Sequence, residues 1–226
     1  MCTVTFVPVT DGFVITSNRD EKITRDRALP PQKHSFQETE ITFPKDQKAG
    51  GTWIAYTKNK VIVLLNGGQE KHVARPSYRN SRGIIALEII ASSNSLSYWN
   101  NLNLIDIEPF TIVFFEENQL YQLQWNEHEK SCKKLSNTQS HIWSSVTLYS
   151  EEMRLSRKNW FQEFLSQHKT ISAQNLLHFH QHTETENKEY GLQINRKNNL
   201  KTVSISQCVI SKKDIKMTYL DLFDQK

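Results

Sequence analysis

The second residue of the chain, Cys2, has the chemistry of a nucleophile that carries its own base. Cysteine is small enough that an initiator Met1 before it is commonly removed, and this would leave Cys2 with a free α-amino group. A thiol needs a base to become a thiolate, and an α-amine with a pKa of about 8 suits that task. On position alone, Cys2 is equally consistent with a small apolar residue that begins a strand.

A polar run, Asn18-Arg19-Asp20-Glu21, ends the second predicted strand. The Asp11-Gly12 turn between the first two strand patterns predicts a hairpin, which brings this run across from the amino terminus. Arg19 or Asp20 could then hold the α-amine and the thiolate of Cys2 through charge-assisted hydrogen bonds. Taken alone, the same run also fits an ordinary polar turn.

Two Gly-Gly pairs, Gly50-Gly51 and Gly67-Gly68, bracket a second predicted hairpin in a chain with only 7 glycines. Glycine permits positive φ angles and close backbone approach, so both ends of this hairpin could line a pocket. Asn66 stands just before the second pair, at the end of an apolar strand. Its side-chain amide can donate a hydrogen bond to a developing oxyanion.

The elements that must position these residues alternate between strands and pairs of helices. The polar and proline-containing stretch from Asn18 to Lys48 is expected to be a long loop with one short strand near 41–43. Helix pairs between antiparallel hairpins argue against a doubly wound sheet and favour helical layers over stacked antiparallel sheets. No linker or repeat divides the chain, so residues 1–226 are expected to form one domain.

The expected strands and helices follow from hydrophobic periodicity and from capping residues. Strands are expected at 2–9, 13–16, 52–56, 60–65, 110–115, 120–125, 141–146, 190–194, 201–210 and 216–219. Helices are expected at 81–91, 95–102, 151–167 and 172–181, with serines as their candidate caps at positions 81, 150 and 172.

Composition argues against several function classes. The 28 Lys and Arg exceed the 24 Asp and Glu only slightly, and the basic residues are scattered, so no nucleic-acid partner is expected. Three cysteines, Cys2, Cys132 and Cys208, form no CxxC pair, which argues against a disulfide framework or structural zinc. No secretory signal or membrane-length apolar run appears, so a cytoplasmic protein without an integral membrane segment is expected.

One histidine cluster has spacings that occur in metal sites. His178, His180 and His182 follow His168 closely, and His178 and His182 share a helix face. The glutamate that accompanies such a pair in zinc proteases is missing. A polar helix end is therefore favoured, and no metal and no cofactor are expected.

Four features together, Met1-Cys2, Asn18 to Glu21, Gly50-Gly51-Thr52-Trp53 and Asn66, resemble the NRDE family, also called the TANGO2-like or transport and Golgi organisation 2 family. The resemblance is specific across this first part of the chain. Further on, the segment Lys201 to Ile210 is similar to the Thr- and Ser-rich closing strand of that family.

The resemblance implies an α+β fold of the amino-terminal-nucleophile hydrolase type. Such a fold is a four-layer αββα sandwich, in which helical layers enclose two antiparallel sheets. It also implies a relationship to choloylglycine hydrolases and penicillin V acylases, which cleave linear amide bonds with an amino-terminal cysteine.

By that analogy, each residue of the candidate site receives a role. Cys2 would be nucleophile and base, Asp20 would hold its amine, and Asn66 would donate to the oxyanion. Arg19 would orient the thiolate or a substrate carboxylate. The residues expected to bind the substrate, a small-molecule amide or acyl compound, are Asn18 and Trp53.

Two departures from the acylases leave a second function open. Ser17 stands where the acylases carry an arginine, and serines stand at Ser144-Ser145 where an asparagine is expected. These departures favour a non-catalytic carrier. The resemblance implies haem, acyl-CoA or another lipid as its ligand, and a connection with haem or lipid metabolism. The intact Cys2, Asp20 and Asn66 favour a hydrolase. Fold membership alone does not choose between these functions.

Overall fold

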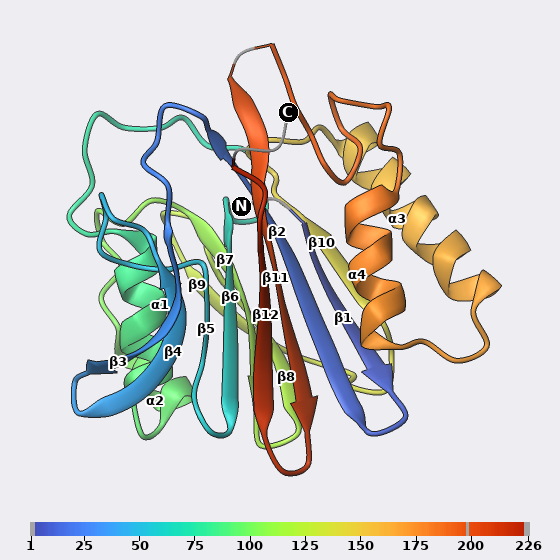
Figure 1. Ribbon diagram of the computed structural model, residues 1–226. Coiled ribbons are helices and arrows are strands. Elements are labelled where there is room, and N and C mark those ends of the chain that lie inside the picture. The colour runs from blue at the N-terminus through green and yellow to red at the C-terminus, as the bar shows by residue number, and fades with distance from the viewer. Residues whose placement is uncertain (1–2, 198, 224–226) are drawn as a thin grey trace. The chain divides into compact units, whose positions relative to one another are not determined.

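The computed structural model describes residues 3–197 and 199–223 (Figure 1). The chain divides into two compact units. One unit comprises Met1–Arg25 with Asn137–Lys226, and the other comprises Asp26–Ser136. Within the described residues, each unit holds one antiparallel sheet and two helices. The α+β class with two antiparallel sheets is thus confirmed. The four-layer stacking and the single domain over 1–226 stay predictions.

The first unit is built on a sheet with the strand order β10-β1-β2-β11-β12. Strand β2 is central and pairs with β1 on one side and with β11 on the other, and Asn18, Arg19 and Asp20 of its polar run are buried. The strand bounds are β1 (Thr3–Val9), β2 (Gly12–Lys22), β10 (His141–Ser144), β11 (Leu200–Ser211) and β12 (Ile215–Asp221).

Two helices of this unit, α3 (Glu151–Gln167) and α4 (Ala173–His182), pack on its sheet (Figure 1). Both begin at predicted serine caps: the Ser150 hydroxyl accepts a hydrogen bond from the Met153 amide, and Ser172 forms a capping box with Asn175. An apolar cluster joins helices and sheet through Val7, Val14, Phe161, Phe164, Leu176, Phe179 and Leu192. Burial of these side chains holds the helix pair in place.

The second unit is built on a sheet with the order β3-β4-β5-β6-β7-β8-β9. Its helices are α1 (Arg82–Ala91), which packs on β4, β5 and β6, and α2 (Ser95–Asn101). The predicted cap Ser81 accepts a hydrogen bond from the Gly83 amide. The strand bounds are β3 (Leu29–Phe36), β4 (Thr39–Lys45), β5 (Ile54–Tyr56), β6 (Lys60–Asn66), β7 (Phe110–Glu116), β8 (Gln119–Trp125) and β9 (Lys130–Leu135).

The short strand predicted near 41–43 is confirmed as part of β4, but the long loop predicted for the rest of 18–48 was wrong. Strand β2 runs on to Lys22, and the hairpin of β3 and β4 follows it. Strand β3 lies at a sheet edge, where Pro30 and Pro31 are tolerated and the pairing register shifts. An edge strand of this kind lacks the apolar alternation that marks a half-buried strand. The same reason explains why β9, a polar edge strand, was not predicted.

The predicted strand at 190–194 was also wrong, because this segment consists of turns and bends. Leu192 and Ile194 are buried in two apolar clusters, which produced the strand-like alternation. The carbonyl groups of Tyr190 and Gly191 accept hydrogen bonds from the side chain of Arg157 rather than from a neighbouring strand.

Substitution of Gly51 by alanine should destabilise the second unit. A Cβ atom at this position would stand 2.5 Å from the Gly83 carbonyl carbon and 2.6 Å from the Ile84 amide nitrogen. The backbone would have to shift, at a cost of about 1–3 kcal/mol in the free energy of unfolding. Urea denaturation measures this loss.

The matched control is Gly50→Asn in the same loop. Gly50 has φ +70°, which asparagine tolerates, and the nearest atom to an added Cβ is Ile84 Cδ1 at 4.0 Å. This variant should therefore lose less stability than Gly51→Ala. Equal losses would contradict the steric explanation.

Candidate functional site

Cys2, the predicted nucleophile, lies outside the described residues. The residue after it, Thr3, begins β1 and pairs with Asn18 of β2. The groups around Thr3 and Asp20 are therefore the described part of the candidate site in the first unit.

Asp20 is buried, and both of its carboxylate oxygens accept short hydrogen bonds. Tyr149 donates its hydroxyl to Oδ2 at 2.5 Å, and Thr202 of β11 donates its hydroxyl to Oδ1 at 2.5 Å. Thr202 in turn accepts a hydrogen bond from the Ile194 amide at 2.9 Å, which fixes its rotamer. Since two hydroxyl groups from different segments hold the carboxylate, its orientation is set by the fold.

A second buried group, Arg157 of α3, reaches the beginning of β1. Its Nε donates to the carbonyl of Tyr190 at 3.0 Å, its Nη2 donates to that of Gly191 at 2.6 Å, and its Nη1 donates to the hydroxyl of Thr3. The guanidinium carbon also lies 3.5 Å from the centre of the Tyr149 ring. One side chain thus joins a helix, a turn, the ring that holds Asp20, and β1.

The amide of Asn18 is engaged entirely by protein groups. Its Nδ2 donates to the carbonyls of Leu192 at 2.6 Å and His180 at 3.2 Å, and its Oδ1 accepts from His180 Nδ1 at 2.6 Å. His180 Nε2 then accepts from the hydroxyl of Thr5 at 2.8 Å. Burial, aided by the charge of Arg157, lowers the pKa of His180 to about 3, so the ring is neutral.

The opposite face of the sheet carries Arg19, which is buried and lies 3.6 Å from Glu21 in an ion pair. Ser17 shares this face and pairs with Ser206 of β11, while Arg19 pairs with Ser204. All three serines are buried, and among the described residues their hydroxyls have no hydrogen-bond partner. Serine at position 17 therefore removes a charge from this face but keeps it polar.

The serines found in place of the acylase asparagine lie near β1. Ser144 of β10 pairs directly with Thr3. Ser145 is buried, and its hydroxyl lies 2.9 Å from that of Thr147. The segment in which the acylases carry an asparagine thus lies at the beginning of β1 here, but its serine side chains are shorter than asparagine.

The predicted oxyanion donor, Asn66, ends β6 of the second unit, where it pairs with Phe110. Trp53, the predicted substrate contact, is a buried residue just before β5 of the same unit. Asp20 belongs to the first unit, so the sharing of one site by these three residues stays a prediction.

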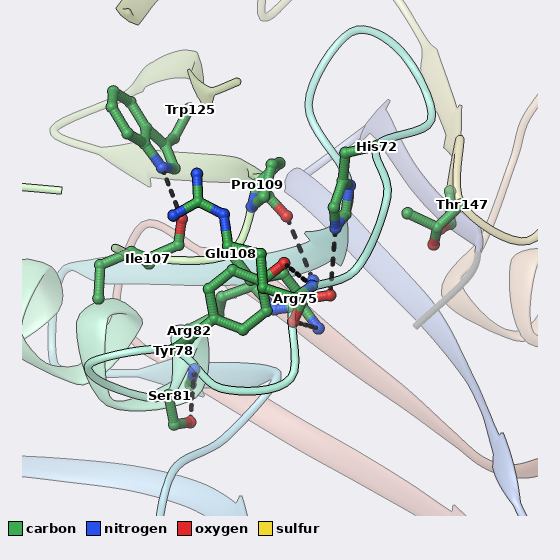
Figure 2. Close-up of polar contacts among 12 residues, drawn as sticks. His72, Arg75, Tyr78, Ser81, Arg82, Ile107, Glu108, Pro109, Trp125 and Thr147 are labelled. Carbon is green, nitrogen blue, oxygen red and sulfur yellow. Dashed lines mark hydrogen bonds and ion pairs between the residues drawn. The ribbon is translucent and has the colours of Figure 1, made fainter. Parts of the chain in front are cut away.

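The chain after Asn66 contacts a polar cluster of His72, Arg82, Glu108 and Pro109, and Figure 2 shows these four residues. The carbonyl of Pro109 accepts from the amide of Gly67 at 3.0 Å and from Arg82 Nη1 at 3.2 Å. Glu108 lies 2.8 Å from Arg82 Nη2 and 3.3 Å from His72 Nε2. Gly67 itself has φ +88°, a conformation that favours glycine. The backbone that carries Asn66 is therefore firmly anchored.

The histidines of α4 divide between its two sides. His180 points to Thr5 and Asn18 of the sheet, whereas the rings of His178 and His182 contact each other with centroids 4.4 Å apart. Within residues 3–197 and 199–223, no three His, Cys, Asp or Glu side chains form a group that could hold a metal ion.

Four residues of this network were not predicted as site residues: Tyr149, Arg157, His180 and Thr202. Thr202 lies in the segment that resembles the closing strand of the family, and that resemblance was the available signal. His180 was noticed only as part of a histidine cluster. Tyr149 and Arg157 stand beside and inside a helix whose sequence gives no sign of their burial.

Replacement of His180 by glutamine should flatten the acid dependence of stability. The folded pKa lies below the unfolded value of about 6.5, so between about pH 6.5 and about pH 3 the unfolded chain binds a proton that the folded chain does not. The free energy of unfolding should therefore decrease as the pH is lowered through this window. This group contributes at most about 1.4 kcal/mol per pH unit. Urea denaturation of both proteins from about pH 7 to about pH 5 measures the difference. Parallel pH dependences would contradict a buried neutral His180.

Comparison with known proteins agrees with the sequence motifs. Among solved structures, Anbu from Hyphomicrobium sp. strain MC1 is similar at a TM-score of 0.40 and 8% sequence identity, with 99% of this chain and 89% of that chain covered. No curated protein matches the chain. In the described residues, no helix has the length and apolar character needed to cross a membrane. A family model described as transport and Golgi organisation 2 matches residues 1–218. The chain therefore belongs to the transport and Golgi organisation 2 family, the NRDE family that its motifs resemble.

Proposed function

We propose that this protein is a hydrolase of linear amide bonds, with Cys2 as an amino-terminal nucleophile once Met1 is removed. The observation that supports this most directly is the buried carboxylate of Asp20, held by the hydroxyls of Tyr149 and Thr202. A buried carboxylate is costly unless it is well paired, and a fixed one suits the task of holding an amine. It lies on β2, the strand that pairs with β1.

In this proposal the thiol proton of Cys2 moves to its own α-amine, and the thiolate attacks the carbonyl carbon of the substrate amide. The tetrahedral intermediate collapses as the carbon–nitrogen bond breaks, and the α-ammonium returns the proton to the leaving amine. Water then cleaves the thioester, which releases the acid and restores the thiol. Asp20 holds the ammonium, and Asn66 donates to the oxyanion.

The remaining site residues receive supporting roles. Arg19, buried on the face that carries Ser17 and Ser204, orients the thiolate or a carboxylate of the substrate. Trp53 contributes an apolar surface to the substrate site. Since the Asn18 amide is used by His180 and Leu192, Asn18 acts in this proposal by fixing the strand rather than by binding substrate through that amide.

The rival function is a cytoplasmic carrier of haem or acyl-CoA. Haem and acyl-CoA both carry negatively charged groups, so binding either gives no reason to bury a carboxylate in short hydrogen bonds, and Asp20 therefore favours the hydrolase. Ser17 and Ser145 give the carrier its support, because they replace side chains of the acylase set. Turnover and ligand binding, measured on the same protein, separate the two functions.

Cys2 should be the most reactive thiol of the processed protein. Desolvation raises the pKa of Cys208, which is buried, and also that of Cys132, although Cys132 is exposed, so both thiols stay protonated at neutral pH. An adjacent ammonium does the opposite for Cys2. Brief treatment with iodoacetamide, followed by mass mapping on protein with a verified Cys2 amino terminus, measures the three rates. Preferential labelling of Cys132 would contradict a nucleophilic role for Cys2.

Two substitutions test catalysis itself. Cys2→Ser should keep the fold but lose most turnover, because a hydroxyl is a much weaker nucleophile at neutral pH. Asn66→Ala should slow turnover about a hundredfold or more, as expected for loss of one oxyanion donor. A panel of N-acyl amino acids and acyl-homoserine-type amides provides the substrates.

Asn101→Ala, at the end of α2, is the matched control for Asn66→Ala, because Asn101 is exposed. It should leave the rate unchanged. No turnover of any substrate, together with saturable binding of haem or acyl-CoA, would establish the carrier in place of the hydrolase.

A further inference from the structure

A continuous chain of contacts runs from helix α3 to the carboxylate of Asp20. The guanidinium of Arg157 lies 3.5 Å from the centre of the Tyr149 ring, and the Tyr149 hydroxyl donates to Asp20 Oδ2 at 2.5 Å. Tyr149 and Arg157 are both buried, at 2% and 0% exposure, so solvent does not screen these contacts. All three residues belong to the first unit of the chain.

The opposite charges of Arg157 and Asp20 explain why these contacts occur together. Among the described residues, the contacts of Arg157 are the carbonyls of Tyr190 and Gly191, the hydroxyl of Thr3 and the Tyr149 ring, and none is a carboxylate. A buried guanidinium needs a compensating negative charge. Tyr149 connects it to one, because its ring faces the cation while its hydroxyl donates to Asp20.

The same guanidinium also controls the beginning of β1. Its Nη1 donates to the hydroxyl of Thr3, the residue that follows Cys2. The guanidinium that contacts the Tyr149 ring is therefore also the group that holds β1, the strand that follows Cys2. A change in Arg157 would therefore affect the carboxylate and the strand at once.

We infer that Tyr149 and Arg157 are positioning residues for the reaction at Cys2. Tyr149 fixes the carboxylate of Asp20 that holds the α-amine, and Arg157 sets the position of Tyr149 relative to β1. This inference rests on the proposed function. It assigns to α3 and the residues before it a part in catalysis that the motifs near the amino terminus do not indicate.

The test measures how fast iodoacetamide alkylates Cys2, with Cys132 in the same molecule as the internal standard. Tyr149→Phe keeps the ring and removes the hydroxyl that donates to Asp20, which retains its bond from Thr202. The thiolate–ammonium pair of Cys2 should then be held less well. The Cys2 rate should fall by on the order of ten- to a hundredfold, while the Cys132 rate and the melting temperature stay nearly constant.

The matched control is Tyr190→Phe. Tyr190 is a tyrosine of the same unit that stacks on Trp160 with ring centroids 5.8 Å apart and supplies its carbonyl, not its hydroxyl, to Arg157. This substitution should leave the Cys2 rate unchanged. Loss of reactivity in both variants would show a general structural effect and overturn the inference.

A double-mutant cycle identifies the path through Asp20. Asp20→Asn should slow Cys2 alkylation, and Tyr149→Phe added to it should have no further effect, since the two residues act through one hydrogen bond. Additive losses would overturn the assignment of Tyr149 to Asp20.

Arg157→Lys and Arg196→Lys form a second pair. Arg196 lies 5.1 Å from the centre of the Tyr149 ring and donates to the carbonyls of Glu189 and Leu148, but Arg157 is the one that binds Thr3. Lysine cannot reproduce the forked contacts of arginine. Arg157→Lys should slow Cys2 alkylation and Arg196→Lys should not. If Arg157→Lys fails to fold, the tyrosine pair and the cycle decide the question.

The outcomes separate the two proposals. If Cys2 reacts no faster than Cys132 in the unaltered protein and Asp20→Asn changes nothing, the proposed function fails and this inference fails with it. If Asp20→Asn slows Cys2 but Tyr149→Phe does not, the proposed function stands and the positioning role of Tyr149 is overturned.

Discussion

The constraint on which the first unit depends is the burial of one carboxylate, that of Asp20, in the central strand of its sheet. Such a group must be paired, and the two hydroxyls that pair with it come from segments well over a hundred residues away in the sequence. Strand β11 must lie beside β2 to supply Thr202, and the segment before α3 must return to supply Tyr149. Arg157 then needs Tyr149 and Thr3. The position of α3, the closing strand and the beginning of β1 are therefore linked through a single buried charge.

The alternation of side chains along β2 divides this strand between two tasks. Asn18 faces the helices, where its amide and the neutral ring of His180 connect β1, α4 and the turn that contains Leu192. Arg19 faces the other way, beside buried serines of β2 and β11. Because alternate residues of a strand point to opposite faces, one short run can serve the packing of the unit and the chemistry of a site together. A polar motif is therefore stable in a central strand only when both faces of the sheet provide polar or charged partners for its side chains.

In the second unit, hydrogen bonds fix the position of the backbone near Asn66 rather than that of a buried charge. Asn66 ends an apolar strand, and the next residue is held by the carbonyl of Pro109, which Arg82 also contacts. Membership of the transport and Golgi organisation 2 family fits a chain that carries its recognisable motifs in both units. The hydrolase proposal assigns the nucleophile and its carboxylate to one unit and the oxyanion donor to the other. The proposal therefore depends on residues from both units, and each of these residues is held by contacts within its own unit.

The sequence by itself determined the α+β class, the helices and their serine caps, the family, and the candidate residues Cys2, Arg19, Asp20 and Asn66, because periodicity, capping and short motifs are local signals. It failed for β3 and β9, since edge strands need no apolar alternation, and for 190–194, where alternation reflected burial in a turn. Only the tertiary structure decided that Asp20 is held by Tyr149 and Thr202, that Arg157 reaches Thr3, and that the Asn18 amide is engaged. Contacts between residues far apart in sequence depend on strand order and helix packing, which no local pattern records.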